Sequence, residues 1–141
     1  MTLFLDTSAL VKLYIAEEET AMVMTAVQSA KIVTVSTLAM PETVSSFTRK
    51  AAEGTLTQGD AQEAFKNLLN DWPNLERVDL DDWIAKETAV LTRSKGLRGA
   101  DAVHLATCAR VSRERRGVRF LAFDDALNEA AKTVVKLWEG Q

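Results

Sequence analysis

Short apolar segments alternate along this chain with longer segments in which apolar residues recur every three or four positions. The first apolar segment, Leu3–Leu5, ends abruptly at the carboxylate of Asp6, and two hydroxyl residues follow it. A buried strand that delivers an acid to the carboxyl edge of a parallel sheet has this pattern. We therefore expect Leu3–Leu5 to be the first strand and the next helix to begin near Ser8.

Further short segments are rich in β-branched or aromatic residues, which is typical of strands. We expect strands over Lys31–Val35, Glu76–Leu80, Arg119–Phe123 and Val134–Leu137. The segments between them have helical periodicity. Strands that alternate with helices predict an α/β fold, with a parallel sheet of about five strands covered by helices on both faces.

The helices are predicted from apolar stripes and capping residues. We expect them over Ser8–Tyr14, Glu17–Ala30, Thr37–Glu53, Thr57–Trp72, from Asp81 or Asp82 to Gly96, over Ala100–Arg113, and around Leu127 and Ala130. Thr57–Trp72 has the clearest stripe, and its Phe65 is expected to join Phe47 in the core. Ala100–Arg113 is apolar on nearly every side, which predicts a buried helix.

The composition is that of one globular domain of ordinary size. With 141 residues, 47% hydrophobic and 26% charged, residues 1–141 are expected to fold as a single domain. No apolar run reaches the roughly 18 residues of a membrane span. Asp6 and Lys12 interrupt what would be the apolar core of a signal peptide. The only cysteine, Cys108, suits a reducing compartment. We therefore expect a cytoplasmic protein without membrane contacts.

Acidic residues follow the ends of several predicted strands. Asp6 and Asp124 each come directly after an apolar strand, Glu42 lies in the first turns of the helix after the second strand, and Asp101 begins the buried helix. In a doubly wound sheet, the carboxyl ends of strands and the N-termini of the following helices lie at the same edge. All four acids can therefore converge there.

Four carboxylates in one cleft repel one another unless cations neutralise them. Oxygen ligands of this kind suit Mg²⁺ or Mn²⁺, and such ions lower the pKa of a bound water and hold a phosphodiester for attack. Each acid also has a structural interpretation, because aspartate is a favoured N-cap and acids suit the first turn of a helix.

Four segments that carry these acids resemble the PIN-domain ribonucleases, and more narrowly the VapC toxins of bacterial and archaeal toxin–antitoxin pairs. The segments are Leu5–Leu10, Pro41–Glu42, Leu97–Ala106 and Phe123–Leu127. The most specific of them contains Asp-Ala-Val-His-Leu-Ala, which begins at Asp101. The resemblance covers essentially the whole chain.

The resemblance implies a Rossmann-like three-layer α/β/α sandwich and Mg²⁺- or Mn²⁺-dependent cleavage of RNA. It assigns catalytic and metal-binding roles to the four acids, with Asp125 beside Asp124 as a neighbouring acid whose place in the site stays open. Ser8 or Thr7 would be a hydroxyl that orients Asp6 or a metal-bound water. The family also implies a homodimer and a cognate antitoxin, which covers the site and binds operator DNA through its own domain.

A net charge of −3 gives no general attraction to nucleic acid, so RNA contacts must be local. Arg49, seven residues after Glu42, and Lys12, six after Asp6, are candidates for these contacts, and Arg98 is a third. Ordinary surface pairing is the alternative for Arg49 and Lys12, and pairing with a nearby acid is the alternative for Arg98.

Other residues have both functional and structural interpretations. The densest basic cluster can bind phosphates or be a solvated helix end; it comprises Arg110, Arg113, Arg115, Arg116 and Arg119. His104 is expected to be a packed, hydrogen-bonded core residue rather than a ligand. The tryptophans could stack on bases but are expected to pack against helices or to lie at a dimer surface; they are Trp72, Trp83 and Trp138.

Two other functional classes remain as alternatives. One is a PIN-like module that only binds RNA or a protein partner, and a missing site acid would favour it. The other is a receiver-like phosphoacceptor domain, which needs paired acids after the first strand and a lysine just after a late strand. Here the first acid is single, and Lys136 lies within the last predicted strand.

Overall fold

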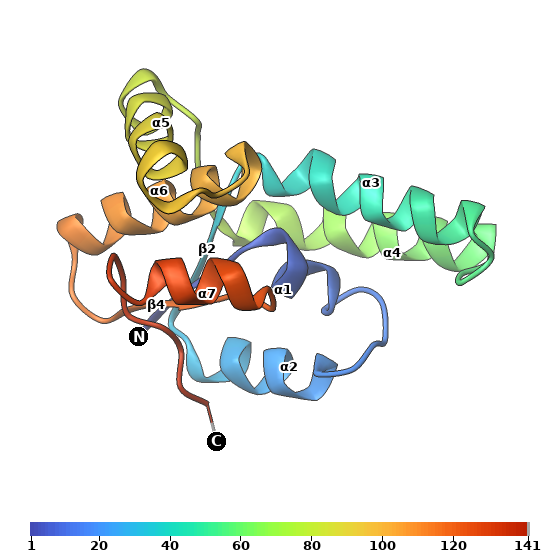
Figure 1. Cartoon of the computed structure of the whole chain (residues 1–141). Helices are drawn as coiled ribbons and strands as arrows, with labels where there is room; N and C mark the ends of the chain where they lie inside the picture. Colours follow the sequence, from blue (N-terminus) through green and yellow to red (C-terminus); the bar gives the residue numbers. More distant parts are fainter. Residues whose placement is uncertain (141) are drawn as a thin grey trace.

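A parallel sheet lies between two layers of helices in the computed structural model, which describes residues 1–140 (Figure 1). Its strands are β1 (Thr2–Leu5), β2 (Ile32–Ser36), β3 (Glu76–Val78) and β4 (Val118–Leu121). Their order is β3-β2-β1-β4, and every neighbouring pair is parallel. The three-layer α/β/α fold expected from the sequence is confirmed. Gln141, at the end of the predicted domain, lies outside the described residues.

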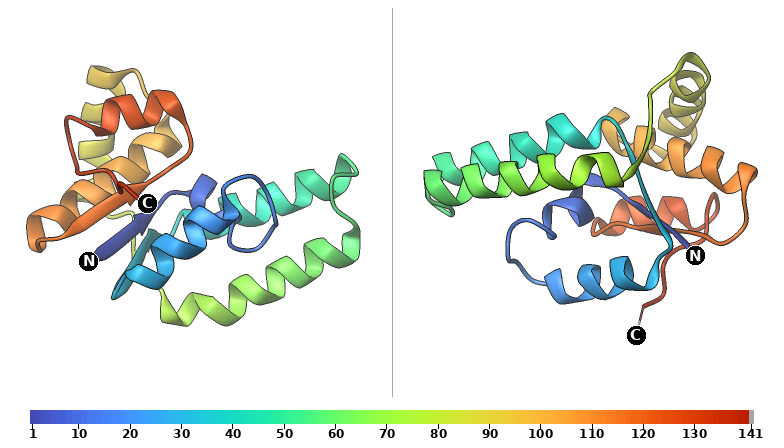
Figure 2. Two further views of the ribbon diagram at one scale, coloured as in Figure 1. Left: turned by 90° about the horizontal axis from the view of Figure 1, so that it is seen from below. Right: turned by 180° about the vertical axis from the view of Figure 1, so that it is seen from behind.

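The helices connect the strands and cover both faces of the sheet. They are α1 (Thr7–Val11), α2 (Thr20–Ser29), α3 (Ala39–Ala52), α4 (Gln58–Asp71), the short 3₁₀ turn η1 (Trp72–Asn74), α5 (Asp82–Lys95), α6 (Gly99–Glu114) and α7 (Asp125–Ala131). Helices α3 and α4 run side by side and extend away from the sheet (Figures 1 and 2).

The central strand β1 shows why the core has two halves. Leu3 and Leu5 pack on one face with α1, α2, α3 and α4, whereas Phe4 packs on the other face with α6 and α7. Successive side chains of a strand point to opposite faces, so a strand covered on both sides is apolar throughout. The α6 residues from Ala102 to Cys108 are all buried, as expected for a helix that is apolar on nearly every side.

The predicted fifth strand, Val134–Leu137, is wrong as an element. Only one bridge, between Phe120 and Leu137, joins this segment to β4. The amides of Val134 and Val135 both donate to the carbonyl of Ala131 and so continue the turns that end α7. The chain therefore becomes extended too late to form more than one rung beside β4.

Several predicted boundaries also shift. Helix α1 ends at Val11, and α2 begins at Thr20 rather than at Glu17, because Glu19 before it has a left-handed backbone with φ of 70°. Phe47 is 2% exposed, but Phe65 is 40% exposed, so the prediction of Phe65 as core is wrong. Helix α4 packs against α3 along only part of its apolar stripe. Within residues 1–140, no helix has the length and apolar character to cross a membrane.

Candidate active site at the carboxyl edge of the sheet

Asp6 lies where β1 ends and α1 begins. It is the N-cap of α1, and its Oδ1 accepts hydrogen bonds from the amide of Ala9 at 3.0 Å and from the hydroxyl of Ser8 at 2.7 Å. The side chain is 4% exposed. Asp6 is therefore a helix cap, as its structural interpretation holds, and it is also a buried carboxylate at the edge where the strands end.

Ser8 joins the first acid to the segment that carries the last one. Its hydroxyl donates to Asp6 and accepts a hydrogen bond from the amide of Phe123 at 3.0 Å. Asp124 follows Phe123 directly and caps α7, because its Oδ1 accepts from the amide of Leu127 at 2.8 Å. One hydroxyl thus fixes the loop after β4 relative to the end of β1.

Glu42 is held by two side chains from different elements. Its Oε1 accepts a hydrogen bond from the hydroxyl of Thr7 at 2.6 Å and lies 2.6 Å from Nε2 of His104. An ionised carboxylate only accepts, so Nε2 carries the proton of this second bond. His104 is 1% exposed, and its Nδ1 has no hydrogen-bond partner within residues 1–140. The orientation of Glu42 therefore depends on α1 and on α6.

His104 was expected to be a packed, hydrogen-bonded core residue, and it is both. Its link to Glu42, 62 residues away in the chain, was missed. The available signal was its place three residues after Asp101, within an otherwise apolar helix. A polar side chain in a buried helix needs a hydrogen-bond partner. The acids predicted at the carboxyl edge of the sheet, where this helix begins, were the nearest candidates.

Asp101 lies half-exposed in the first turn of α6 and makes no hydrogen bond or ion pair within residues 1–140. Both of its oxygens are therefore available to a ligand. Asp124 and Asp125 are both exposed. Asp125 has no hydrogen bond or ion pair within that same range, and nothing links it to the other acids.

A pocket of about 710 Å³ opens beside these acids. Glu42 and Asp101 line it together with Thr7 and Ser8. The three predicted RNA-contact residues also line it; they are Lys12, Arg49 and Arg98. The Nζ of Lys12 lies 4.9 Å from the centre of the Phe123 ring. The structure thus brings acids and cations from α1, α3 and α6, or from the caps of these helices, to one opening.

The acids influence one another electrostatically. Burial raises the pKa of Asp6 to about 6, although the hydrogen bond from Ser8 and the charge of His104 act in the opposite direction. The pKa of Asp101 is also raised, first by burial and then by the negative charges of Asp124 and Glu42. These couplings mean that the four carboxylates share one electrostatic environment.

Glu42 behaves differently from the two raised acids. Partial burial acts to raise its pKa, but the hydrogen bonds from His104 and Thr7, with the charges of His104 and Arg49, lower it overall. Glu42 is thus kept ionised, whereas Asp6 resists ionisation. Neighbouring acids whose pKa values are shifted in opposite directions are typical of functional sites.

The donor set fits a hard divalent cation. The hydrogen bonds of Asp6, Glu42 and Asp124 each go to a single oxygen, which leaves the second oxygen of each carboxylate for an ion. Such all-oxygen ligands suit Mg²⁺ or Mn²⁺. Within residues 1–140, no three acidic, histidine or cysteine side chains already lie at the spacing of a metal centre. The carboxylates would have to draw together around an ion.

Comparison with known proteins defines the class. The model of the PIN domain matches residues 3–133, which is nearly the whole chain. The chain therefore belongs to the PIN-domain family.

Individual relatives are VapC proteins. The chain is 30% identical over 108 residues to ribonuclease VapC45 of Mycobacterium tuberculosis (strain CDC 1551 / Oshkosh), across 77% of this chain and 75% of that protein. The fold resembles Mycobacterium tuberculosis VapC20, a toxin that cleaves the sarcin-ricin loop, with a TM-score of 0.64, 19% identity, and coverage of 91% of this chain and 94% of that one. It also resembles a toxin–antitoxin complex from Klebsiella pneumoniae, with a TM-score of 0.62, 18% identity, and coverage of 88% and 87%.

Proposed function

We propose that this protein is a Mg²⁺- or Mn²⁺-dependent endoribonuclease and the toxin of a toxin–antitoxin pair. The observation that carries the proposal is that Glu42 and Asp101 line a pocket with basic side chains, and that Asp101 is electrostatically coupled to Glu42, Asp6 and Asp124. Kinship with ribonuclease VapC45 supports the same reaction class.

Each residue has a role that follows from its position. The four acids would hold the cation, which when bound supplies a nucleophilic water at neutral pH and neutralises charge on the phosphate. Thr7 and His104 orient Glu42, and Ser8 orients Asp6. Four cationic side chains line the pocket, and Lys50 among them pairs with Glu17. The other three would contact the RNA phosphates; they are Lys12, Arg49 and Arg98.

The proposal includes the partners that a toxin requires. The similar protein from Klebsiella pneumoniae forms a toxin–antitoxin complex, and we infer a cognate antitoxin for this chain, through which operator DNA would be reached. Phe65 and Leu69 leave an apolar surface on α4 that suits a protein contact, either with a second copy in a homodimer or with the antitoxin. An RNA substrate would place the protein in the cytoplasm.

Cleavage of structured RNA tests the activity. The purified protein is incubated with RNA and Mg²⁺, with RNA and EDTA, and as the variants Asp6→Asn and Asp101→Asn. We expect cleavage only in the first reaction, with at least a 100-fold loss in each variant, because both acids hold the cation that supplies the nucleophile. Asp60→Asn, an exposed aspartate in the first turn of α4, is the matched control and should cleave normally.

Cleavage that persists in EDTA or in both site variants would contradict the metal-dependent mechanism. If no RNA from a broad set is cleaved by the wild-type protein, the enzymatic proposal fails and a binding module is favoured. A parallel Asp124→Asn and Asp125→Asn pair decides which of these two neighbours serves the site, and we expect loss of cleavage only for Asp124.

A further inference from the structure

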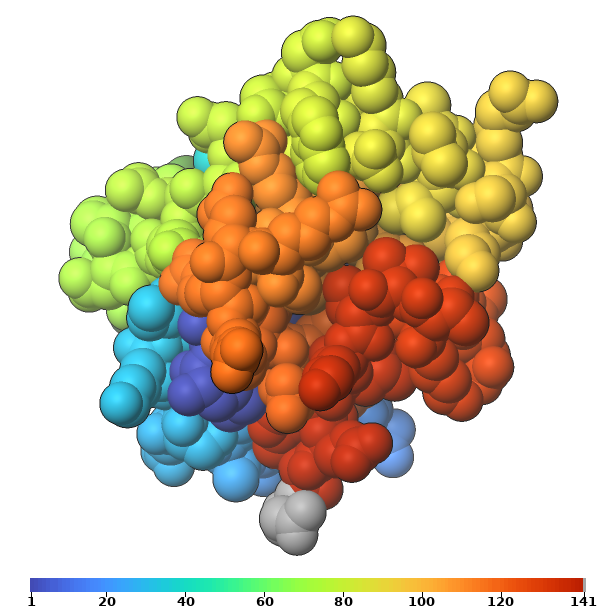
Figure 3. Space-filling model, turned by 90° about the vertical axis from the view of Figure 1, so that its left-hand side faces the viewer, coloured from blue at the N-terminus to red at the C-terminus, as the bar shows by residue number. Residues whose placement is uncertain are grey.

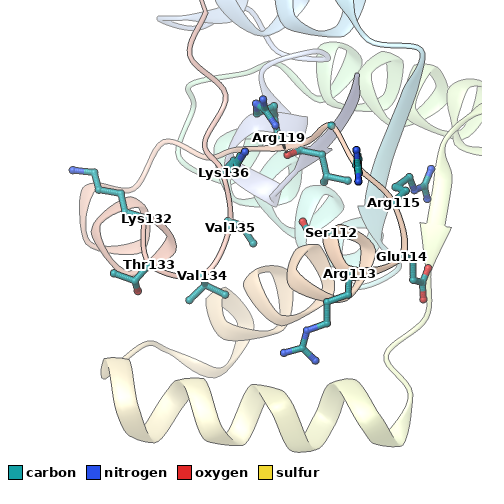
Figure 4. Close-up of a pocket in the computed structure, with 13 residues that line it drawn as sticks. Ser112, Arg113, Glu114, Arg115, Arg119, Lys132, Thr133, Val134, Val135 and Lys136 are labelled. Atoms are coloured by element: carbon teal, nitrogen blue, oxygen red, sulfur yellow. Dashed lines mark hydrogen bonds between the residues drawn. The ribbon is translucent and has the colours of Figure 1, made fainter.

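A basic hollow lies at the edge of the sheet opposite the acids. It has a volume of about 820 Å³ and separates the end of α6 from the residues after α7 (Figure 3). Figure 4 shows Arg119 and Lys136 together on one side of it, with Lys132 and Thr133 toward α7 and Ser112 to Arg115 toward α6. Helix α6 has 16 residues and is therefore about 24 Å long, so the hollow is well separated from Asp101 at its other end.

The lining of the hollow is strongly cationic. Six basic side chains face a single acidic one, Glu114, although the whole chain has a net charge of −3. The six are Arg113, Arg115, Arg116, Arg119, Lys132 and Lys136. Positive charge is therefore concentrated here against the overall balance of the protein.

Part of this charge has no internal counterion. Arg115 pairs with Glu76, and Lys132 pairs with Glu129. The side chains of Arg116 and Lys136 are exposed and have no ion pair within residues 1–140. Their charges are available to a ligand.

The hollow continues along the outer edge of β4. A second hollow of about 390 Å³ shares Arg119, Lys132, Val135 and Lys136 with the first. Val118 and Val135 are buried and line the first hollow, and Val135 lines the second as well, so both hollows have an apolar side chain in their lining. Because they share these four residues, the two hollows adjoin and form one groove, which we call the basic groove. Its six basic side chains outnumber its two acidic ones, Glu114 and Glu139, so it suits a ligand with several negative charges.

A second, more basic surface would add to the affinity of the pocket beside the acids for RNA. Four basic side chains line that pocket, but Glu17, Glu42 and Asp101 line it too, so it has little excess positive charge. Affinity for a phosphate backbone comes from unneutralised Lys and Arg side chains. Arginine provides four of the six cations in the basic groove, and its planar guanidinium binds phosphate oxygens in pairs.

We propose that the basic groove binds the sugar–phosphate backbone of RNA at a distance from the cleavage site. This inference rests on the proposed function for its choice of RNA, because the groove would hold a remote part of the same substrate. The arginines and lysines contact phosphates, and the apolar side chains of the lining lie against sugar or base faces.

Salt-dependent RNA binding tests the groove without any need for cleavage. A labelled 20-nucleotide RNA is titrated in EDTA with the Asp6→Asn protein and with the same protein carrying Arg116→Gln and Lys136→Gln. Each phosphate contact to a single strand adds about 0.7 to the slope of log affinity against log salt. We expect the slope to fall by about 1.4 and affinity at 0.1 M salt to fall roughly 20-fold.

A control with equal charge change excludes a general electrostatic effect. Lys66→Gln with Lys86→Gln removes two exposed lysines from α4 and α5, outside both hollows. We expect this pair of changes to leave the slope within about 0.3 of the parent. Thermal unfolding of both double variants should stay close to that of the parent. The side chains of Arg116 and Lys136 make no hydrogen bond or ion pair within residues 1–140, and the ion pair of Lys86 with Asp82 is exposed and contributes little.

Equal slopes for the groove variant and the control would overturn the proposal. So would displacement of the RNA by an oligoglutamate of the same length at equal concentration, since that result would assign the groove to an acidic protein segment. Both readouts are independent of catalysis, so a failure of the ribonuclease assay leaves this test intact.

Discussion

Asp6 combines two roles that place opposite demands on one carboxylate. As a helix cap it accepts two hydrogen bonds that favour its charged form, but its burial favours the neutral form more strongly. The net result is a pKa of about 6 against the usual 3.8. A nearby cation would stabilise the ionised form and lower the pKa of Asp6 toward its usual value.

The stability of the metal-free protein should therefore depend on Asp6 between pH 4 and pH 6. The folded state keeps the Asp6 proton in this range whereas the unfolded state releases it, so stability present below pH 4 is lost as pH rises through 6. The loss amounts to about 3 kcal/mol. Urea unfolding in EDTA from pH 4 to pH 7, for the wild type and Asp6→Asn, measures it.

The difference between the two proteins isolates Asp6, because other acids titrate in both. We expect Asp6→Asn to gain relative to the wild type as pH rises. A difference that stays constant across this range would show that Asp6 has an ordinary pKa. Asparagine is also a favoured N-cap, so the substitution keeps the cap of α1.

His104 should act as a positioning residue for Glu42. In His104→Leu, the loss of the hydrogen bond from Nε2 should raise the pKa of Glu42 and lower cleavage about tenfold, since a hydrogen bond to a charged group contributes about 1.5 kcal/mol. His104→Gln places an amide donor near the position of Nε2. This variant should restore most of the cleavage rate and bring the pKa of Glu42 back toward its wild-type value. Carboxyl NMR titration of Glu42 and kcat for RNA cleavage are the measurements.

A purely structural histidine would give a different pattern. Both variants would then change the unfolding free energy without moving the pKa of Glu42. That outcome would exclude the positioning role, even if both variants had reduced activity.

At the scale of elements, α4 shows how tertiary packing selects part of a helical stripe. Leu68 is fully buried, whereas its neighbour Leu69 is 47% exposed. Both belong to the same periodic pattern, but α4 contacts α3 on one side and leaves the rest of the stripe uncovered. The sequence pattern identified the helix correctly and overestimated the width of its buried face.

The two leucines of α4 give a matched pair of substitutions. We expect Leu68→Ala to lower the free energy of unfolding by about 3 kcal/mol, because it leaves a cavity in the core. Leu69→Ala changes helix propensity equally but should cost less than about 1 kcal/mol. Chemical denaturation of both variants tests this, and equal losses would mean that Leu69 is covered in solution, as in a dimer.

The whole molecule brings the four acids together through its sheet order. β1 lies between β2 and β4, so the segments that follow these three strands meet at one edge, and α6 begins there as well. Mutual repulsion among the acids raises the pKa of Asp101 and opposes the folded state. In the proposed metal site, a bound cation would remove this repulsion, and the free energy gained would contribute to the affinity for the ion.

Mg²⁺ should consequently stabilise the whole fold. At tenfold excess over its dissociation constant, the ion adds about 1.4 kcal/mol, which is a rise of about 4 °C in Tm. Asp101→Asn should reduce this rise, and the control Asp60→Asn should keep it. Differential scanning fluorimetry at pH 7.5 with and without Mg²⁺ is sufficient, and an equal rise in Asp101→Asn would remove that residue from the ion's ligands.

The order of strands and helices followed from the sequence because local signals determine it. Three segments show this, because the apolar pattern of each matches the residues that it buries. They are the apolar run before Asp6, the β-branched run of β2 and the apolar helix α6. The placement of Asp6 directly after β1 was equally local. Asp124 was expected directly after its strand, but β4 ends at Leu121, so Ala122 and Phe123 lie between them and Asp124 is the N-cap of α7. These features need no knowledge of distant residues.

Tertiary structure alone decided which distant groups meet and which surfaces remain open. The bond between His104 and Glu42 joins α6 to α3, and the one between Ser8 and Phe123 joins α1 to the loop after β4. The segment Val134–Leu137 forms a single bridge, and Phe65 remains exposed, because neighbouring elements determine these outcomes. Periodicity records what a segment is able to bury, whereas the packed neighbours decide what it does bury.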